Sequence, residues 1–295
     1  MHRGAPLGIG HIPRLVPCAS MWQREQMDEL TPRTQHSLLD VVHLRKVYAQ
    51  RKRQTLAVDD LHFSVAEDEF VAVVGPSGCG KTTMLRMIAG LLPPSGGSVL
   101  LRARPVTEPP PEMVLVFQDY GRSLCHWRSV ARNVYFALEH TGLSGAERAR
   151  RVHQALEVVG LEDFRDHYPY ELSGGMQQRL QIARALAYEP RILLMDEPFG
   201  SLDALTRAEL EDELLDIWTG QPKTVLFVTH DIEEAVYLSD RVLILSARPS
   251  QVVEELRVDL PRPRDQIATR GHARFIEYRN HIYMRIRQET SGAAP

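Results

Sequence analysis

The stretch Gly75-Pro76-Ser77-Gly78-Cys79-Gly80-Lys81-Thr82 decides how this chain folds. It fits the pattern G-x-x-x-x-G-K-[ST] and directly follows the continuous apolar run Phe70 to Val74. Beyond the motif, apolar residues recur at steps of three and four, which predicts a helix; they are Met84, Leu85, Ile88, Leu91 and Leu92. Strand, glycine loop and helix in this order are the context that makes the motif a phosphate-binding loop.

The chemistry of this loop depends on its backbone and on two side chains. Glycines let backbone N–H groups converge on phosphate oxygens, and the N-terminus of the following helix adds the positive end of its dipole. We expect Lys81 to reach the β- and γ-phosphates of a nucleoside triphosphate, and the Thr82 hydroxyl to ligate Mg²⁺. The other loop residues expected to contact the nucleotide are Gly75, Pro76, Ser77, Gly78, Cys79, Gly80 and Thr83.

Composition narrows the class of protein. The chain has 295 residues, enough for one substantial α/β core or two modest ones. With a net charge of −3 and a pI of about 6.5 there is no basic surface for nucleic acid, and we expect no nucleic-acid partner. The 3 cysteines have the spacing of neither a zinc site nor a disulfide framework, which favours a reducing cytosol. No run approaches the ~20 apolar residues of a membrane span.

The chain divides into three parts. Residues 1–37 are predicted to be a flexible extension, because they are rich in Pro, Gly, Arg and His and lack the apolar core of a signal peptide. Residues 38–250 alternate between strand and helix patterns, and the later strands are continuous apolar runs. This alternation predicts an α/β fold with a mostly parallel sheet covered on both faces. Residues 251–295 predict a short strand, a proline-rich turn and a basic helix that ends at Gln288.

The expected elements follow from hydrophobic period and from Gly and Pro breaks. The predicted strands are 39–47, 55–65, 70–74, 98–102, 113–117, 192–195, 224–228 and 241–245. The predicted helices are 130–161, 173–187, 203–218 and 231–238.

Two carboxylates stand at the end of a predicted buried strand, in the stretch Ile192-Leu193-Leu194-Met195-Asp196-Glu197. Such a strand delivers its last residues to the same sheet edge as the glycine loop. Asp196 can then hold Mg²⁺, and Glu197 can act as general base toward the attacking water. The alternative, a strand followed by ordinary acidic helix-capping residues, is disfavoured by the phosphate loop upstream.

A second glycine-rich helix start lies at Leu172-Ser173-Gly174-Gly175-Met176-Gln177-Gln178-Arg179. Ser173 suits an N-cap, and the glycine pair permits close approach of another backbone. An ordinary helix start is one interpretation. A second phosphate cradle is the other, because a helix N-terminus of this composition attracts anions.

That octamer resembles the signature motif of ATP-binding cassette (ABC) ATPases, and the resemblance covers roughly residues 38–250. It implies a P-loop NTPase core of the ABC type with an antiparallel β subdomain and a helical subdomain at about 119–175. It also implies roles for single residues. Gln118 resembles the Q-loop glutamine, which touches Mg²⁺ and water; Asp203 the D-loop aspartate; and His230 the switch histidine that contacts the γ-phosphate. Tyr48 resembles the aromatic residue that stacks on adenine.

The resemblance further implies a shared ATP site. A signature helix on a separate subdomain cannot reach its own P-loop, so two subunits pair head to tail. Each of two ATP molecules then lies between Lys81 of one subunit and the signature residues of the other, which are Ser173, Gly174, Gly175 and Gln177. Two departures from the family pattern are expected to matter little. Asp68 stands where glycine is usual, and Asp tolerates tight turns. The Cys79 thiol is expected to be incidental.

Several details favour the ATPase subunit of an importer over a soluble ABC ATPase of DNA repair or translation. The span from Gln118 to Ser173 is too short for the long coiled coil of repair ATPases, and the chain holds one cassette where translation ATPases have two. A P-loop kinase or GTPase lacks the signature helix. The stretches 195–207 and 224–238 resemble the nitrate/sulfonate/taurine importer ATPases.

That group implies the partners: an integral membrane permease and, through it, a substrate-binding protein, with the ATPase at the cytoplasmic face of the membrane. The transported substrate stays open among nitrate, alkanesulfonates, taurine, bicarbonate and pyrimidine precursors. The segment from Tyr120 to Trp127, with Leu124, is a candidate permease-docking surface. The alternative is that Trp127 anchors the core of the helical subdomain.

Overall fold

The computed structural model describes residues 37–50, 53–118, 120–200, 202–220 and 223–291. The predicted N-terminal extension, residues 1–37, therefore lies outside the described residues except for Ser37.

A six-stranded sheet carries the fold, in the order β10-β9-β3-β8-β7-β6. Five of its strands run parallel, and β10 is antiparallel to β9. The strands are β3 (Phe70–Val74), β6 (Met113–Val116), β7 (Ile192–Asp196), β8 (Thr224–Val228), β9 (Arg241–Leu245) and β10 (Val252–Arg257). Every residue of β3, β7 and β8 is buried, which explains why these strands are continuous apolar runs in the sequence. The predicted parallel sheet is confirmed.

A second, antiparallel sheet has the order β2-β1-β4-β5. Its strands are β1 (Ser37–Gln50), β2 (Arg53–Ala66), β4 (Gly96–Leu101) and the two-residue β5 (Arg104–Pro105), which the sequence did not predict. Asp68 turns the chain from β2 into β3 at a positive φ of 59°, a conformation that Asp tolerates better than most residues. This sheet is the expected antiparallel β subdomain.

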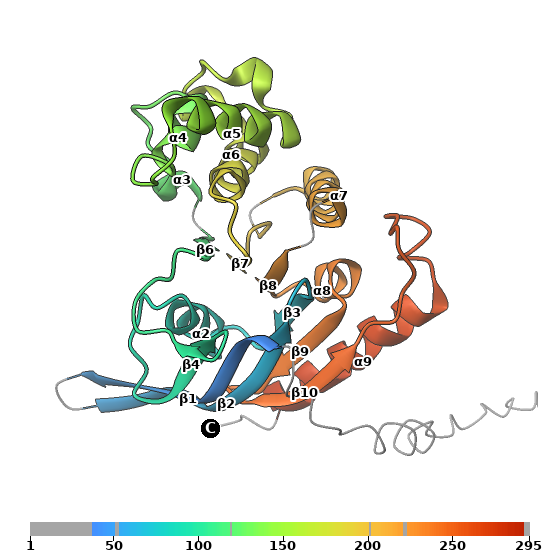
Figure 1. Ribbon diagram of the computed structural model, residues 1–295. Coiled ribbons are helices and arrows are strands. Elements are labelled where there is room, and N and C mark those ends of the chain that lie inside the picture. Colours follow the sequence, from blue (N-terminus) through green and yellow to red (C-terminus); the bar gives the residue numbers. More distant parts are fainter. Residues whose placement is uncertain (1–36, 51–52, 119, 201, 221–222, 292–295) are drawn as a thin grey trace, which may run out of the picture. The chain divides into compact units, whose positions relative to one another are not determined.

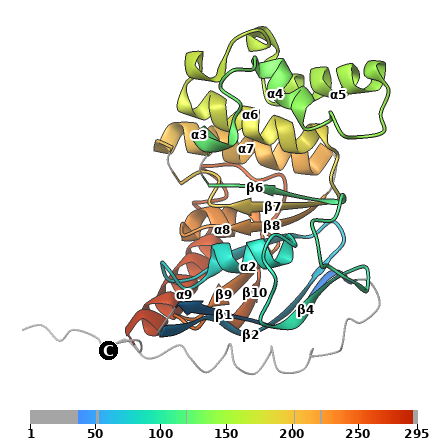
Figure 2. The ribbon, with the colours of Figure 1, turned by 90° about the vertical axis from the view of Figure 1, so that its left-hand side faces the viewer.

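The two faces of the parallel sheet pack into separate cores. Along β3, Val71 and Val73 face the core shared with α2 (Lys81–Ile88) and the antiparallel sheet, whereas Phe70, Ala72 and Val74 face the other core. The second core is built with α7 (Ala204–Gly220), α8 (Ile232–Leu238) and α9 (Ala273–Ser291). Figure 2 shows α2 on one side of the strands and α7 on the other. The segment predicted after residue 250 thus adds β10 to this sheet and α9 to this core.

Residues 120–187 form the helical subdomain, which Figure 1 shows as a group of helices set away from the β1–β2 hairpin. Its elements are α3 (Tyr120–Ser123), α4 (Val130–Phe136), α5 (Gly145–Val158), the 3₁₀ turns Glu162–Phe164 and Pro169–Glu171, and α6 (Gly174–Ala187). None of the helices in the described part of the chain is long and apolar enough to cross a membrane.

Two helix predictions need correction. The pattern over 130–161 is not one helix, because α4 ends at Phe136 and α5 begins anew with Ser144 as its N-cap. The helix after the glycine loop ends at Ile88, before Leu91 and Leu92, because Gly90 adopts a positive φ of 70°. The other predicted helices agree with α6, α7 and α8 to within two residues at each end.

Candidate nucleotide-binding and hydrolysis site

Four parallel strands deliver the candidate residues to one edge of the sheet. The glycine loop follows β3, Gln118 follows β6, Glu197 follows β7 and His230 follows β8. Because the strands are parallel and in register, with Asp196 of β7 beside Val228 of β8, their carboxyl ends meet. Residues separated by more than a hundred positions in the sequence are thereby brought together.

The glycine loop depends on backbone conformations that side chains would disturb. Gly78 and Gly80 have φ values of 74° and 124°, in the region that favours glycine. A Cβ on Gly80 would also lie 3.0 Å from the carbonyl oxygen of Ala57. The Lys81 side chain is only 6% exposed, and its Nζ donates to the carbonyl oxygens of Gly75 (2.9 Å) and Pro76 (3.3 Å). The ammonium group is therefore held inside the curve of the loop.

Thr82 and Asp196 form an oxygen-rich pair beneath the loop. The Thr82 hydroxyl donates to Asp196 Oδ1 at 3.2 Å, and Asp196 is 4% exposed. Burial raises the pKa of the Asp196 carboxyl, and the Thr82 hydroxyl partly offsets that effect. A buried carboxylate with a hydroxyl beside it supplies the hard oxygen ligands that Mg²⁺ prefers, so these residues fit the predicted metal.

Glu197 is the centre of a hydrogen-bonded group at the mouth of the site. Its Oε2 accepts from Gln118 Nε2 at 3.0 Å and lies 3.0 Å from His230 Nδ1. Its backbone has a positive φ of 46°, and its N–H donates to the carbonyl of Val228 at 2.8 Å. The strand end thus fixes Glu197 from the backbone, while two side chains from neighbouring strands orient its carboxylate. The arrangement can hold a carboxylate base beside a phosphate loop.

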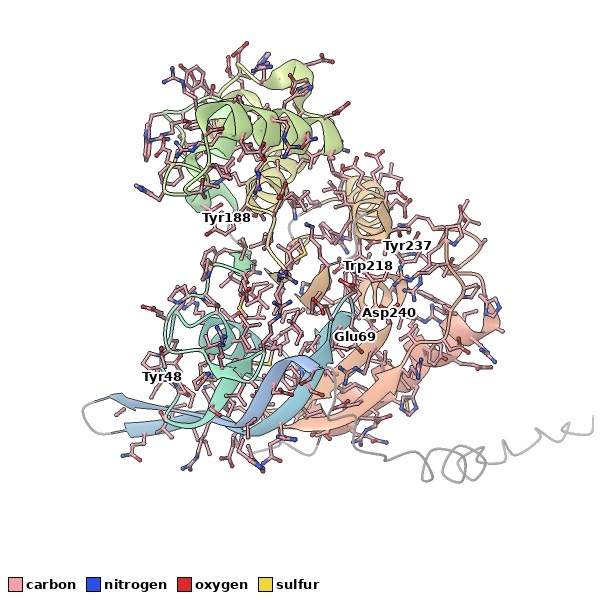
Figure 3. All side chains as sticks on the ribbon, in the orientation of Figure 1. Tyr48, Glu69, Tyr188, Trp218, Tyr237 and Asp240 are labelled. Carbon is pink, nitrogen blue, oxygen red and sulfur yellow. The ribbon has the colours of Figure 1, made fainter. Side chains whose placement is uncertain are left out.

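Tyr48 lies where the β subdomain meets the P-loop helix. Its hydroxyl is 3.3 Å from Thr83 Oγ1, and Figure 3 shows the residue on the β1 side of α2. The Lys46 ammonium lies 5.5 Å from the centre of the Tyr48 ring. The ring is 38% exposed, so a face of this aromatic group stays open to a ligand.

Comparison with known proteins shows the family of the chain. A family model described as ABC transporter matches residues 58–200. An uncharacterised ABC transporter ATP-binding protein of Methanocaldococcus jannaschii is 48% identical over 266 residues, which cover 90% of this chain and 97% of the relative. This chain belongs to the family of ABC transporter ATP-binding proteins. It is therefore a nucleotide-binding ATPase cassette.

Two further ABC proteins are informative. The taurine import ATP-binding protein TauB of Rhizobium johnstonii is 45% identical over 241 residues, covering 81% of this chain and 90% of that protein. A solved ATP-binding cassette, dimeric in a post-hydrolysis state with bound ADP and Pi, is 30% identical with a TM-score of 0.66. The match covers 76% of this chain and 100% of that one.

The predicted signature segment begins α6, away from the hydrogen bonds of the P-loop. Ser173 is the N-cap, and its hydroxyl oxygen accepts from the Met176 N–H at 3.3 Å. Gln177 Nε2 donates to the carbonyls of Pro169 and Leu172, which braces the preceding turn. A Cβ on Gly175 would lie 2.7 Å from Thr206 Cγ2, so this glycine lets α6 approach α7 closely. Within the described residues, no hydrogen bond joins this segment to the P-loop.

The predicted D-loop residue Asp203 caps α7. Its Oδ1 accepts from the N–H groups of Leu205 (3.2 Å) and Thr206 (3.1 Å), and these bonds lower the pKa of its carboxyl. Four residues later, Arg207 donates to the Leu202 carbonyl and to Asp231 Oδ2. Arg207 therefore ties the D-loop to the residue after His230, a contact that the sequence analysis missed.

Two further residues of α6 position the Q-loop and were also missed. Gln181 Nε2 donates to the Phe117 carbonyl (3.0 Å) and to Ser123 Oγ (3.1 Å), and Arg184 donates to the Ser123 carbonyl. Gln181 is nearly buried, at 6% exposed. Gln181 is one of several polar residues on α6, and no local sequence pattern distinguishes it from Gln177 and Gln178.

The predicted docking segment divides in two. Leu124 is 3% exposed and belongs to the core, so its expected place on the surface was wrong. Trp127 is 77% exposed, so it does not anchor the subdomain core. The loop between them is braced by buried Asn133, whose side chain bonds the backbone of Cys125, Arg128 and Ser129. In the P-loop, Cys79 is buried, and burial raises the pKa of its thiol.

Proposed function

We propose that this chain is the ATP-binding and hydrolysing subunit of an ABC importer for a small anion or organic sulfonate, of the nitrate/sulfonate/taurine/bicarbonate class. The observation that carries the proposal is the Glu197 carboxylate, held by Gln118 and His230 at the strand end beside the P-loop. The importer class rests on the likeness to the taurine import ATPase. The helices between Gln118 and Ser173 are at most 14 residues long, which gives no support to a DNA-repair ATPase with a long coiled coil.

In this proposal each residue has a distinct task in binding and hydrolysis. The loop N–H groups and the Lys81 ammonium bind the phosphates, while Tyr48 stacks on adenine. Thr82, Asp196 and Gln118 would hold Mg²⁺, which when bound neutralises phosphate charge. Glu197 accepts a proton from the attacking water, and His230 both orients Glu197 and contacts the γ-phosphate. The hydrogen bonds already present at Glu197 reduce the reorganisation needed before the proton moves.

A second copy of the chain completes the site in this proposal. Ser173 and Gly174 are exposed at the N-terminus of α6, whereas Gly175 is buried against α7. The signature backbone is thus presented outward on a rigid helix, and the solved cassette with ADP and Pi is dimeric. Two chains related by a two-fold axis can each offer the signature helix to the other's P-loop, with Asp203 at the junction.

The membrane partner in this proposal is a permease that carries the substrate-binding protein. A groove of about 550 Å³ lies between the helical subdomain and the edge strand β6, lined by Phe117, Ser123, Arg184 and Tyr188 among others. Figure 3 shows Tyr188 on the side of the helical subdomain that faces the strands. Because Gln181 ties this groove to the Q-loop, a helix docked there would follow changes at Gln118. The ATPase would then sit at the cytoplasmic face of the membrane.

The Glu197→Gln variant tests the proposal. It keeps the size of the side chain and an oxygen acceptor but removes the base. We expect ATP hydrolysis to fall by about 10²–10⁴-fold, while binding of a fluorescent ATP analogue stays within about twofold of the parent. With the permease co-expressed, uptake of radiolabelled taurine, nitrate or bicarbonate should stop. Glu209→Gln, an exposed carboxylate change on α7, is the matched control. Hydrolysis near the parent rate in Glu197→Gln would exclude this residue as the base.

A further inference from the structure

The segment that follows β10 encloses α8, the helix that begins directly after the candidate switch histidine. At the C-terminal end of α8, Arg264 donates to the carbonyls of Val236 and Tyr237 and, at 2.8 Å, to that of Ser239. Arg262 donates to the Leu238 carbonyl at 3.1 Å. Two guanidinium groups therefore satisfy the last carbonyls of a helix that is only 7 residues long.

The same segment also holds the first turn of α8. Arg270 Nη1 lies 2.9 Å from Glu233 Oε2, and Arg279 Nη1 lies 3.2 Å from Glu233 Oε1. Glu233 is the third residue after His230, and Asp231 between them is the N-cap of the helix. A short helix fixed at both ends moves as one body, so the position of Glu233 sets the position of the chain at His230.

The arginine contacts at the two ends of α8 are here called the clamp. Arg270 also connects this clamp to α7. Its Nη2 lies 2.6 Å from Glu211 Oε2, and Glu211 is fully buried. Gln266 Nε2 donates to Glu211 Oε2 and to Asp212 Oδ1, and the Arg270 guanidinium lies 5.1 Å from the centre of the Tyr237 ring. Figure 3 shows Tyr237 between α7 and the C-terminal segment. One guanidinium thus bridges two carboxylates on two helices, a geometry that the single ammonium of lysine reproduces poorly.

His230 itself has room to move. Its side chain is 54% exposed. A pocket of about 420 Å³ opens beside it, lined by His230 and Glu233 on one side and by Arg279 and Tyr283 of α9 on the other. Its contact with Glu197 is a single hydrogen bond of 3.0 Å. A histidine in such surroundings depends on the backbone that carries it, which makes a clamp on α8 consequential.

We propose that the arginines of the C-terminal segment that contact α8 position His230 for ATP hydrolysis, with Arg270 as the positioning residue that acts through Glu233 and α8. The inference rests on the role proposed above for His230. Arg270 touches neither Glu197 nor the P-loop in the hydrogen bonds of the described residues, so its effect is indirect. These arginines would then support ATP hydrolysis as well as the sheet.

The experiment measures ATP hydrolysis by Arg270→Met, Arg270→Lys and Glu233→Gln, each in the parent and in a His230→Ala background. In the parent background we expect Arg270→Met to lower kcat roughly tenfold, with KM and the Kd of a fluorescent ATP analogue within about twofold. Arg270→Lys should retain more activity than Arg270→Met. In the His230→Ala background none of the three should lower kcat further. Arg274→Gln, which breaks an exposed pair with Asp259 in the same segment, is the control and should match the parent.

Three other outcomes would overturn the inference, and each has a distinct meaning. Equal fold-losses in both backgrounds would mean that the clamp acts on overall structure and not through His230. Parent-like kcat in Arg270→Met and Glu233→Gln would mean that the clamp is irrelevant to hydrolysis. If His230→Ala alone keeps the parent rate, the proposed role of His230 fails, and with it the inference. If Arg270→Met does not fold because it leaves the Glu211 charge buried, Glu233→Gln still decides, because it leaves no unpaired buried charge.

Discussion

Two glycine-rich helix starts in this chain have the same dipole but different surroundings. The loop before α2 is enclosed by strand ends, with Lys81 and Asp196 almost fully buried and Glu197 within hydrogen-bond reach of two neighbours. The start of α6 exposes Ser173 and Gly174, and the contacts of its polar side chains serve its own turn. The first region brings the candidate catalytic side chains together. The second exposes a helix N-terminus, and within the described residues none of those side chains is hydrogen-bonded to it.

The difference teaches where a partner is needed. A helix N-terminus attracts anions in either setting, but only the sheet edge supplies a base and metal ligands from the same chain. The α6 start is nevertheless rigid, since Gly175 lies against Thr206 of α7 and Arg179 pairs with Glu213 at 2.8 Å. Rigidity combined with exposure suits a surface that completes another copy's site, which is the arrangement proposed above.

The largest effect is expected from breaking the exposed helix start with Ser173→Arg. The bulky side chain would stand where the proposed partner's γ-phosphate lies, so ATP-dependent dimerisation should be lost while the monomer still binds ATP. Size-exclusion chromatography in the hydrolysis-deficient Glu197→Gln background measures this, with a loss of at least about 100-fold in apparent dimer affinity expected. Glu209→Gln in the same background is the control.

Mixing subunits sharpens the same comparison. Ser173→Arg chains mixed with Lys81→Ala chains form one intact composite site per heterodimer, with the P-loop of the first and the signature of the second. The mixture should therefore recover part of the ATP-dependent association that each variant lacks alone. Unchanged dimerisation of Ser173→Arg by itself would show that the two helix starts do not share a nucleotide.

The residues gathered around the P-loop could be predicted from the sequence, whereas the side-chain contacts around α6 could not. The P-loop, Asp196, Glu197 and His230 each come directly after a continuous apolar strand, and a parallel sheet brings such residues together without further information. The break between α4 and α5 was also readable in principle, because Ser144 and Glu147 have the spacing of a capping box, and the Glu147 N–H does donate to Ser144 Oγ.

Other features depend on contacts that no local pattern encodes. Leu124 belongs to the buried core although its neighbours in sequence are exposed or half-buried, so hydrophobicity alone did not place it. Gln181 meets the Q-loop across 64 positions, and Arg270 meets Glu211 across 59. Such pairs are fixed by how helices pack on the sheet, which single-sequence periodicity does not give.

Another prediction concerns Glu234, a carboxyl group buried near the edge of the sheet that carries the candidate site. Glu234, on α8 behind His230, has its pKa raised to about 7, chiefly by burial. Because the folded state binds this proton more tightly, the group costs no stability below pH ~4.5 and an increasing amount as the pH rises to about 7. Glu234→Gln removes the titration and can still accept from the Thr229 hydroxyl. Between pH 5 and pH 8 the unfolding free energy of the parent should therefore fall by about 1–3 kcal/mol more than that of Glu234→Gln.

Urea unfolding at a series of pH values measures this difference. Glu209→Gln is the matched control, because it makes the same substitution at an exposed carboxylate on α7. A Glu234→Gln profile parallel to the parent would mean that Arg207, 3.5 Å away, already keeps Glu234 ionised at low pH. The catalytic edge would then bury its charges without a cost in stability.

The smallest effect on the isolated chain is expected at Trp127, on the helical subdomain. Because its ring is 77% exposed, Trp127→Ser should change the unfolding free energy by less than about 0.5 kcal/mol and leave basal ATP hydrolysis at the parent rate. Leu124 is buried in the core, so Leu124→Ala should instead lower the unfolding free energy by about 2–5 kcal/mol. If the exposed ring contacts the permease, as the sequence analysis predicts for this segment, Trp127→Ser should reduce co-purification with the permease and substrate uptake. Normal uptake and co-purification would instead confine permease docking to the groove at Phe117 and Tyr188. A loss of both would mean that the exposure of Trp127, like that of Ser173, is explained by a partner.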